Sequence, residues 1–248
     1  MVFVQETKIQ NPYDGLYEKI WLKESVQGRA VKSKGRAGGL LCIWQEGFFK
    51  VKEVISHKHY LLLIGIARGI RTKMGFGNVY ASNDEEERNV VWHELSQIIA
   101  DGDISWVLGG DFKSVRNEEK RIGRGEVNRT ATSFDHFINE VGLIDLSLAG
   151  SKFTWCNNKE EPAFNKLDRF LIDADLLEMD ETMIQRCLPI SISDHNPIII
   201  GPGKVCWGPK PFKFFNRWME EESFNVVMKD YWINKRRENE ERKGFGGS

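Results

Sequence analysis

The alternation of hydrophobic and polar positions predicts a series of short strands in the first third of the chain. Residues 2–5 form an apolar segment that ends at Glu6, which is either an exposed loop residue or a carboxylate placed at a strand end. Three further apolar runs, at residues 38–44, 48–54 and 59–67, are separated by short polar breaks. This spacing is typical of an antiparallel meander.

A buried strand is predicted at residues 104–108, a short run rich in β-branched and aromatic residues. We expect the glycine pair at 109–110 to turn the backbone sharply and to leave Asp111 at the edge of a sheet. The alternative is that Asp111 only caps the turn or the next helix. Residues 77–81 predict the end of another strand, where Tyr80 is either a core tyrosine or a hydroxyl presented at the same kind of edge.

Two amphipathic helices are predicted by apolar residues at helical spacing. Their apolar stripes are Val91, Leu95, Ile98 and Ile99 in the first, and Phe134, Phe137, Ile138 and Val141 in the second. Ser82 or Asn83 can cap the first helix, and Thr130 or Thr132 can cap the second. Gly142 is suited to end the second helix.

A carboxylate stands inside the apolar strand predicted at residues 167–172. This residue, Asp168, needs a partner if it is buried. The segment 190–200 suggests one, because Asp194 and His195 stand there between two apolar runs. Adjacent side chains on an extended backbone point apart, so we expect Asp194 and His195 to contact different partners.

The length of 248 residues suits one large domain or two small ones. We expect a domain over residues 1–201, and a linker with a C-terminal helix over residues 202–248. Aromatic and basic residues alternate after residue 202, which indicates either contact with nucleic acid or a linker that packs on the domain. The mixed-charge segment 235–243 predicts a helix, followed by a disordered end.

Charge, cysteine usage and hydropathy narrow the class of protein. The net charge is −1, so a nucleic-acid partner must be held by a local basic patch. Four scattered cysteines without a CxxC pair favour reduced thiols in an intracellular protein, nuclear or cytoplasmic. No signal-peptide pattern opens the chain, and the longest apolar run, residues 60–67, is too short to span a bilayer. We predict no secretion and no membrane insertion, and no obligate protein partner is evident.

Acidic residues and a histidine recur at the predicted strand ends. They are Glu6, Asp111, Asp168, Asp194 and His195. Carboxylates without a thiolate or histidine cluster suit Mg²⁺, with Mn²⁺ as an alternative. A histidine oriented by a buried aspartate suits proton transfer or stabilisation of a charged phosphoryl group. The pattern therefore predicts metal-assisted hydrolysis of a phosphoester.

Five short motifs follow one another along the chain. They are QET at 5–7, NVYA at 78–81, GGDF at 109–112, KLDRFLI at 166–172 and SDH at 193–195. In this order they resemble the motifs of the endonuclease/exonuclease/phosphatase superfamily, which includes DNase I and the apurinic/apyrimidinic endonucleases. The segments GRAGGLLCIW, SKFTW and PFKFFNRW are similar to the endonuclease region of plant non-LTR (LINE-type) retrotransposon polyproteins.

The resemblance implies a fold and an activity. The fold would be an α/β (α+β) four-layer sandwich of the DNase I type, with two packed, mainly antiparallel β-sheets flanked by helices. The activity would be that of a Mg²⁺-dependent DNA endonuclease, in which a metal-activated water cuts a phosphodiester and Tyr80 contacts the phosphate.

The resemblance also implies roles for the acidic residues and the histidine. Glu6 would ligate Mg²⁺ with the help of Asp194. Asp111 would orient or deprotonate the attacking water. His195, held by Asp168, would stabilise the phosphorane-like state.

Two departures from the family pattern point to weakened or lost activity. The family expects an asparagine two residues after the GDF aspartate, where this sequence has Lys113, whose ammonium could neutralise Asp111. The family also has a strand with an asparagine, in a WNxRG context, before the QET strand, so we expect an N-terminally truncated copy. The alternatives are a non-catalytic remnant that at most binds nucleic acid, and a phosphatase on the same fold.

Overall fold

The computed structural model describes residues 1–203, except 14, 23–24, 36, 101–102, 117–120, 123–128, 158–161 and 190–192, together with residues 226 and 229–231. Contacts within the chain divide it into two units, Met1–Lys204 and Val205–Ser248. The predicted boundary after residue 201 stays a prediction. The alternating aromatic and basic segment, the helix at 235–243 and the disordered end all lie outside the described residues.

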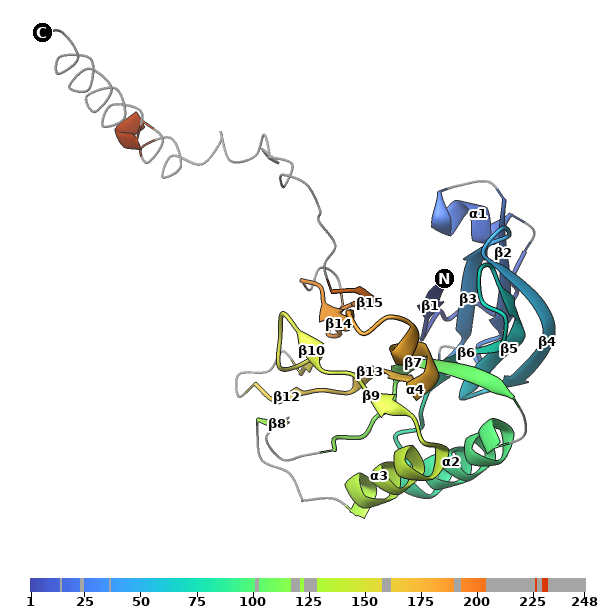
Figure 1. Cartoon of the computed structure of the whole chain (residues 1–248). Coiled ribbons are helices and arrows are strands. Elements are labelled where there is room, and N and C mark those ends of the chain that lie inside the picture. Colours follow the sequence, from blue (N-terminus) through green and yellow to red (C-terminus); the bar gives the residue numbers. More distant parts are fainter. Residues whose placement is uncertain are drawn as a thin grey trace, which may run out of the picture. The chain divides into compact units, whose positions relative to one another are not determined.

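The elements of the first unit alternate between short strands and a few helices (Figure 1). In chain order they are β1 (Val2–Val4), α1 (Leu16–Trp21), β2 (Val26–Val31), β3 (Leu40–Gln45), β4 (Phe49–His57), β5 (Tyr60–Ala67), β6 (Lys73–Tyr80), α2 (Glu85–Ala100), β7 (Ile104–Asp111), β8 (Arg121–Ile122), α3 (Arg129–Val141), β9 (Ile144–Asp145), β10 (Leu148–Ala149), β11 (Trp155–Cys156), β12 (Phe164–Asn165), β13 (Asp168–Ile172), α4 (Ala174–Met179), β14 (Met183–Cys187) and β15 (Ile198–Pro202). None of the helices among the described residues is long and apolar enough to cross a membrane.

Four layers stack around three hydrophobic clusters. Helices α2 and α3 cover one face of a six-stranded sheet with the order β4-β5-β6-β7-β13-β9. The other face of that sheet packs against the sheet β1-β3-β2, and α1 covers the outer face of this second sheet. Smaller sheets, β10-β14-β15 and β11-β12-β8, complete the unit. Nearly all paired strands are antiparallel, so the predicted four-layer α+β sandwich is confirmed.

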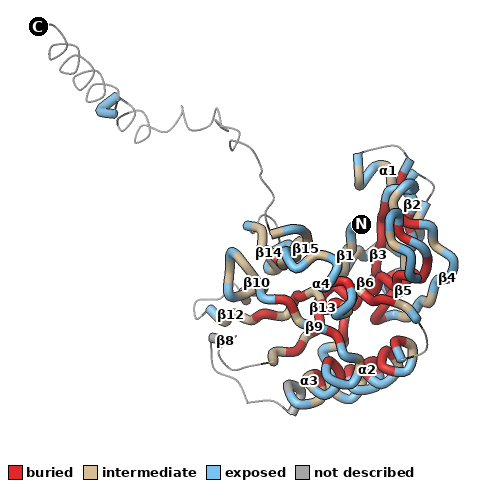
Figure 2. Tube along the Cα trace, in the orientation of Figure 1, coloured by how far each residue is buried: buried red, intermediate tan, exposed pale blue. Residues whose placement is uncertain are grey.

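The strand pattern explains which side chains fill each layer. In β5, Leu62 and Ile64 face α2 and α3, whereas Leu61 and Leu63 face the second sheet. Successive side chains of a strand point to opposite faces, so a strand between two apolar layers reads as a continuous apolar run. The buried residues accordingly concentrate along the middle of the sheets and under the helices (Figure 2).

The predicted meander over residues 38–67 is only partly correct. Strands β4 and β5 form an antiparallel pair, and β6 continues it. Strand β3 does not join them: it pairs with β1 and β2 in the other sheet. Both faces of β3 are buried, so this strand suits the centre of a sheet between two layers. The local pattern predicts a strand but leaves its neighbours undetermined.

Helix α2 connects β6 to β7, which are parallel and therefore need a crossover connection. Its cap is Asp84, whose Oδ1 accepts a hydrogen bond from the backbone N–H of Glu87 at 2.9 Å. The prediction that Ser82 or Asn83 caps this helix is therefore wrong. Ser82 lies two residues before Asp84, where its hydroxyl accepts from the backbone N–H of Asp84.

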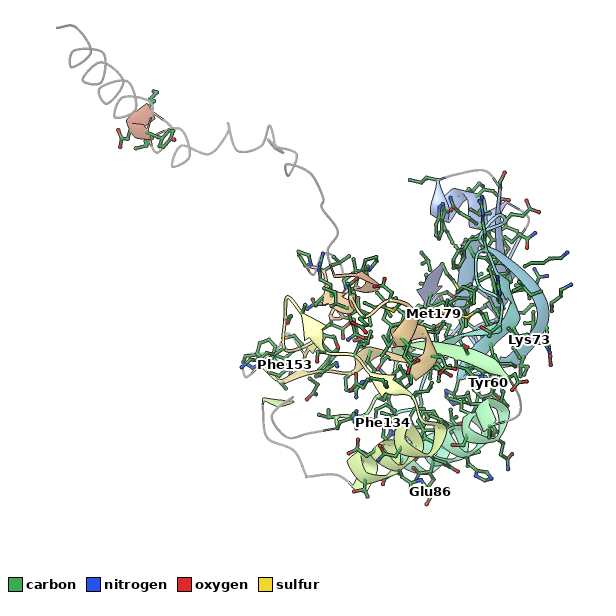
Figure 3. All side chains as sticks on the ribbon, viewed as in Figure 1. Tyr60, Lys73, Glu86, Phe134, Phe153 and Met179 are labelled. Atoms are coloured by element: carbon green, nitrogen blue, oxygen red, sulfur yellow. The ribbon has the colours of Figure 1, made fainter. Side chains whose placement is uncertain are left out.

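Helix α3 packs its apolar stripe under the six-stranded sheet, with Phe134 fully buried (Figure 3). It begins at Arg129, so neither Thr130 nor Thr132 is its N-cap, and that prediction is wrong. Gly142, with φ +66°, follows the last helical residue as predicted.

The glycine pair of β7 serves packing rather than a turn. The strand continues through both glycines to Asp111, in register with β6 and β13. A Cβ on Gly109 would lie 2.4 Å from the Phe170 ring. A Cβ on Gly110, whose φ is +140°, would lie 2.0 Å from the Val79 carbonyl oxygen. The predicted sharp turn is therefore wrong, and the glycines let neighbouring groups approach the strand closely.

Candidate active site at the end of β6 and β7

The ends of β6 and β7 bring Tyr80 and Asp111 to one edge of the six-stranded sheet. Tyr80 pairs with Asp111 in parallel register, and Asp168, the first residue of β13, pairs with Asp111 from the other side. Because β6 and β7 run in the same direction, their carboxyl ends share this edge. Asp111 is only 3% exposed, whereas the edge beside it opens to solvent at Glu6 and Asp194.

His195 joins the two aspartates of this edge. Its Nδ1 lies 2.8 Å from Asp168 Oδ2, and its Nε2 lies 3.8 Å from Asp111 Oδ2. An ionised carboxylate only accepts, so Nδ1–H donates to Asp168 and Nε2 is directed toward Asp111. The partner that the sequence suggested for the buried Asp168 is therefore present.

Asp194 and His195 contact different partners, as expected for adjacent residues on an extended chain. Its Oδ2 accepts a hydrogen bond from Trp155 Nε1 at 2.9 Å. The backbone of Asp194 is also fixed, because its carbonyl accepts from the N–H of Cys156 at 3.1 Å. Strand β11 therefore orients the segment that carries Asp194 and His195.

Thr154 holds the same segment to β13. Its Oγ1 accepts from the backbone N–H groups of Leu167 and Asp168 at 3.0 and 2.9 Å. Its carbonyl oxygen accepts from the N–H of Asn196 at 2.7 Å. Thr154 is fully buried, so one side chain and one carbonyl fix the backbones beside both members of the His195–Asp168 pair.

Glu6 reaches the site through Tyr80. The Tyr80 hydroxyl donates to Glu6 Oε1 at 2.5 Å, and Glu6 is exposed with φ +50°. Gln5, the residue before it, donates to Asn78 Oδ1 at 2.5 Å. Asn78 is completely buried and donates to the carbonyls of Val4 and Leu41 at 3.1 and 3.0 Å. This amide therefore links the two sheets directly behind Glu6.

Lys113 occupies the centre of the site. Its Nζ lies 2.5 Å from Asp111 Oδ2 and 5.3 Å from the centroid of the Tyr80 ring. Its backbone N–H donates to Asp111 Oδ1 at 3.0 Å. Both carboxylate oxygens of Asp111 are thus engaged by one residue. The φ of Lys113 is +49°, a left-handed conformation that asparagine adopts far more readily than lysine.

Burial and charge shift the proton affinities of these groups. Burial and the negative charge of Asp168 raise the pKa of Asp111, although Lys113 and His195 oppose the rise. Burial lowers the pKa of His195, but the hydrogen bond and charge of Asp168 and the charge of Asp111 outweigh it, so the pKa is raised. The site therefore favours a protonated His195.

The pKa values of Tyr80 and Asp194 shift in opposite directions. Burial raises the pKa of Tyr80, and the hydrogen bond and charge of Glu6 and the charges of Asp111 and Asp194 add to the rise. Burial also raises the pKa of Asp194, but the hydrogen bond from Trp155 and the charge of His195 outweigh it and lower the pKa overall. Three carboxylates therefore lie within electrostatic range of one tyrosine hydroxyl.

The donor set fits a hard divalent cation at the exposed side of the site. Asp111, Asp168 and His195 offer ligand atoms within 4.8 Å of one another, but Lys113 and His195 already supply positive charge to these aspartates. Glu6 and Asp194 are the exposed carboxylates of the group. Hard divalent cations keep several waters and take one or two protein carboxylates, and exposed carboxylates are ligands of that kind.

The residues that the sequence singled out lie together at one edge, whereas the residues that support them were missed. Glu6, Tyr80, Asp111, Lys113 and Asp168 all lie at this edge with Asp194 and His195. Asn78, Thr154 and Trp155 were not singled out. The only signal for them was their place in the NVYA and SKFTW segments, and nothing local in those segments indicates a buried amide or a hydroxyl between two strands.

The fold and this site define the class of architecture: the chain has the fold of the DNase I-like endonuclease/exonuclease/phosphatase proteins. The 3′ phosphatase NExo from Neisseria, in a structure with product DNA hairpin, matches with a TM-score of 0.60 and 13% identity over 81% of this chain and 87% of that one. The AP endonuclease LMAP from Leishmania major matches with a TM-score of 0.59 and 11% identity over 79% and 76%.

A third solved structure is the endonuclease domain of TRAS1, a telomere-specific non-LTR retrotransposon. It matches with a TM-score of 0.52 and 13% identity over 73% of this chain and 82% of that one. No protein-family model matches the sequence, and the search of curated proteins found no match. At identities this low, the structural likeness establishes the fold alone. The activity has to be argued from the site.

Proposed function

We propose that the chain is a divalent-metal-dependent phosphodiesterase acting on DNA, a LINE-type endonuclease whose activity is weakened by Lys113. One observation carries the proposal: a continuous series of contacts. It runs from Glu6 through the Tyr80 hydroxyl and ring to Lys113 and Asp111, and on through His195 to Asp168. Acidic, phenolic and imidazole groups that converge at one sheet edge are suited to phosphoryl chemistry.

The roles follow from position and protonation. Glu6 and Asp194 would hold Mg²⁺, or Mn²⁺, which when bound supplies positive charge to a phosphate oxygen. Asp111, buried beside His195, is placed to accept a proton from an attacking water. His195, held by Asp168 and favoured in its protonated form, is placed to stabilise negative charge on the phosphoryl group. Tyr80, whose hydroxyl is aimed at Glu6, is placed to contact the phosphate.

Lys113 is the observation that favours the alternative, a non-catalytic protein that at most binds nucleic acid. The ammonium at 2.5 Å from Asp111 Oδ2 stabilises the charged carboxylate and occupies an oxygen that a water would approach. A phosphatase on the same fold is the third candidate, supported by the likeness to the phosphatase NExo. The three candidate functions differ in what the chain does to DNA: it cuts the backbone, only binds it, or removes a terminal phosphate. One set of assays therefore separates them.

The experiment is the nicking of supercoiled plasmid by the purified chain, with Mg²⁺ and with EDTA. We expect slow, Mg²⁺-dependent nicking that His195→Ala abolishes. The matched control is His93→Ala, since His93 is an exposed histidine of α2 that contacts Gln97 rather than the site.

Two outcomes would contradict the endonuclease. If the folded chain binds DNA but neither it nor Lys113→Asn nicks plasmid, the non-catalytic reading is correct. If it removes a terminal 3′ phosphate from an oligonucleotide while leaving plasmid intact, the phosphatase reading is correct.

A further inference from the structure

A histidine outside the proposed catalytic set binds the backbone of Tyr80 on two sides. His59 lies in the turn between β4 and β5, and its carbonyl oxygen accepts from the N–H of Tyr80 at 2.8 Å. Its ring Nδ1 lies 3.0 Å from the Tyr80 carbonyl oxygen. A carbonyl only accepts, so Nδ1 carries the proton and donates. His59 is 9% exposed, so the contact is shielded from water.

The imidazole takes the place of a missing backbone donor. The β5–β6 ladder runs in register from the pair Tyr60–Val79 to the pair Gly65–Met74, and His59 and Tyr80 stand one position beyond it. There the His59 ring supplies the donor for Tyr80 that a regular strand residue would supply from its backbone. The side chain therefore extends the ladder by one position, to the residue that reaches Glu6.

The far side of the ring lies beside the start of α2. His59 Nε2 lies 3.3 Å from Glu87 Oε2, without an aligned hydrogen bond. Glu87 also accepts from Ser82 Oγ and pairs with Lys58 Nζ. The contacts with Lys58, Ser82 and His59 lower the pKa of Glu87 to about 2. The turn, the chain after Tyr80 and α2 thus meet at one carboxylate.

We propose that His59 is a positioning residue for Tyr80: its Nδ1–H and its carbonyl oxygen fix the Tyr80 backbone at the end of β6. The effect of this positioning on catalysis rests on the proposed function, whereas its effect on the position of the Tyr80 ring does not. Within the described part of the chain, His59 contacts the proposed reaction site only through the backbone of Tyr80.

The test compares His59→Asn with His59→Gln. The asparagine amide nitrogen falls near the place of Nδ1 and can still donate to Tyr80, whereas the longer glutamine places its amide near Nε2, toward Glu87. Both residues are polar amides of similar size, so a general loss of packing affects them alike. His93→Gln, at an exposed histidine of α2, is the matched control.

The primary readout is the ring resonance of Tyr80 in protein labelled with ¹³C-tyrosine, assigned with Tyr80→Phe. We expect the resonance to keep its position in His59→Asn and His93→Gln and to shift in His59→Gln. The secondary readout is plasmid nicking, for which we expect kcat to fall about tenfold in His59→Gln and to stay within about twofold in His59→Asn.

The two readouts separate this inference from the proposed function. If no variant nicks plasmid but the Tyr80 resonance follows the predicted order, the positioning role stands and the endonuclease fails. If the resonance stays in place in His59→Gln, or shifts equally in the asparagine and glutamine variants, the positioning role is overturned whatever the nicking assay gives.

Discussion

Replacement of Lys113 by asparagine should raise the proposed activity, because it removes a cation from the buried Asp111. Nζ lies 2.5 Å from Oδ2 of a carboxylate that is 3% exposed. At this distance and an effective dielectric constant of about 20, the Coulomb attraction is roughly 6–7 kcal/mol, most of which the desolvation of both charges offsets. A net remainder of about 1.4 kcal/mol is a tenfold change in proton affinity, so we expect about tenfold faster nicking.

The pH–rate profile should move in one direction when Lys113 is replaced by asparagine. Without Lys113, burial and the charge of Asp168 raise the pKa of Asp111 with less opposition. A general base acts when it is deprotonated, so the acidic limb of the pH–rate profile should move to higher pH in Lys113→Asn. The assay is plasmid nicking with Mg²⁺ from about pH 5.5 to 9. An unchanged rate and an unmoved limb in a folded variant would refute the reasoning.

Lys113→Gln separates charge from backbone strain. Glutamine also removes the ammonium, but it lacks the tolerance of asparagine for a φ of +49°. The gain in rate should therefore appear in both variants. Relief of the left-handed strain, about 1 kcal/mol, should appear only as a higher Tm of Lys113→Asn relative to Lys113→Gln.

Three further predictions concern the supports of the site. Because the pKa of His195 is raised, its pairing with Asp168 stabilises the folded state fully below pH 6.5, and this stabilisation is lost as the pH rises through the folded-state pKa. The difference in the free energy of urea unfolding between pH 6 and pH 9 should therefore be smaller in Asp168→Asn than in the wild type. Gly110→Ala should destabilise by about 3 kcal/mol or more, because its Cβ would lie 2.0 Å from the Val79 carbonyl oxygen; a denaturation midpoint equal to wild type would contradict this. Asn78→Ala should cost about 2–4 kcal/mol in the same assay, since it leaves two buried carbonyls without their donor; a loss below about 1 kcal/mol would mean that the amide does not link the sheets.

The chain order of apolar and acidic positions was enough to predict much of the site. Glu6 and Asp111 each follow a short apolar run and Asp168 stands in another, and such runs form strands through local preferences that the sequence displays directly. The pairing of Asp168 with His195 followed from the rule that a buried carboxylate needs a partner. The order of five motifs then indicated the sandwich in which these strand ends meet.

Other features depend on neighbours that are distant in sequence. The same local pattern predicts β3 and β4 as strands, yet they belong to different sheets, because strand pairing is decided by which faces can be buried together. The glycines of β7 read as a turn and instead make room for Phe170 and the Val79 carbonyl. A glycine in a sequence does not reveal which group fills the space of its missing side chain.

The sequence by itself indicated which acidic residues stand at strand ends, among them Asp111 and Asp168. Only the tertiary structure decided how they are held. Thr154 fixes the backbones on both sides of the His195–Asp168 pair, and the His59 ring completes the ladder at Tyr80. Local pattern records the burial of each position, whereas the contacts of Thr154 and His59 join residues 13 or more positions apart, whose distances exist only once the sheets have packed.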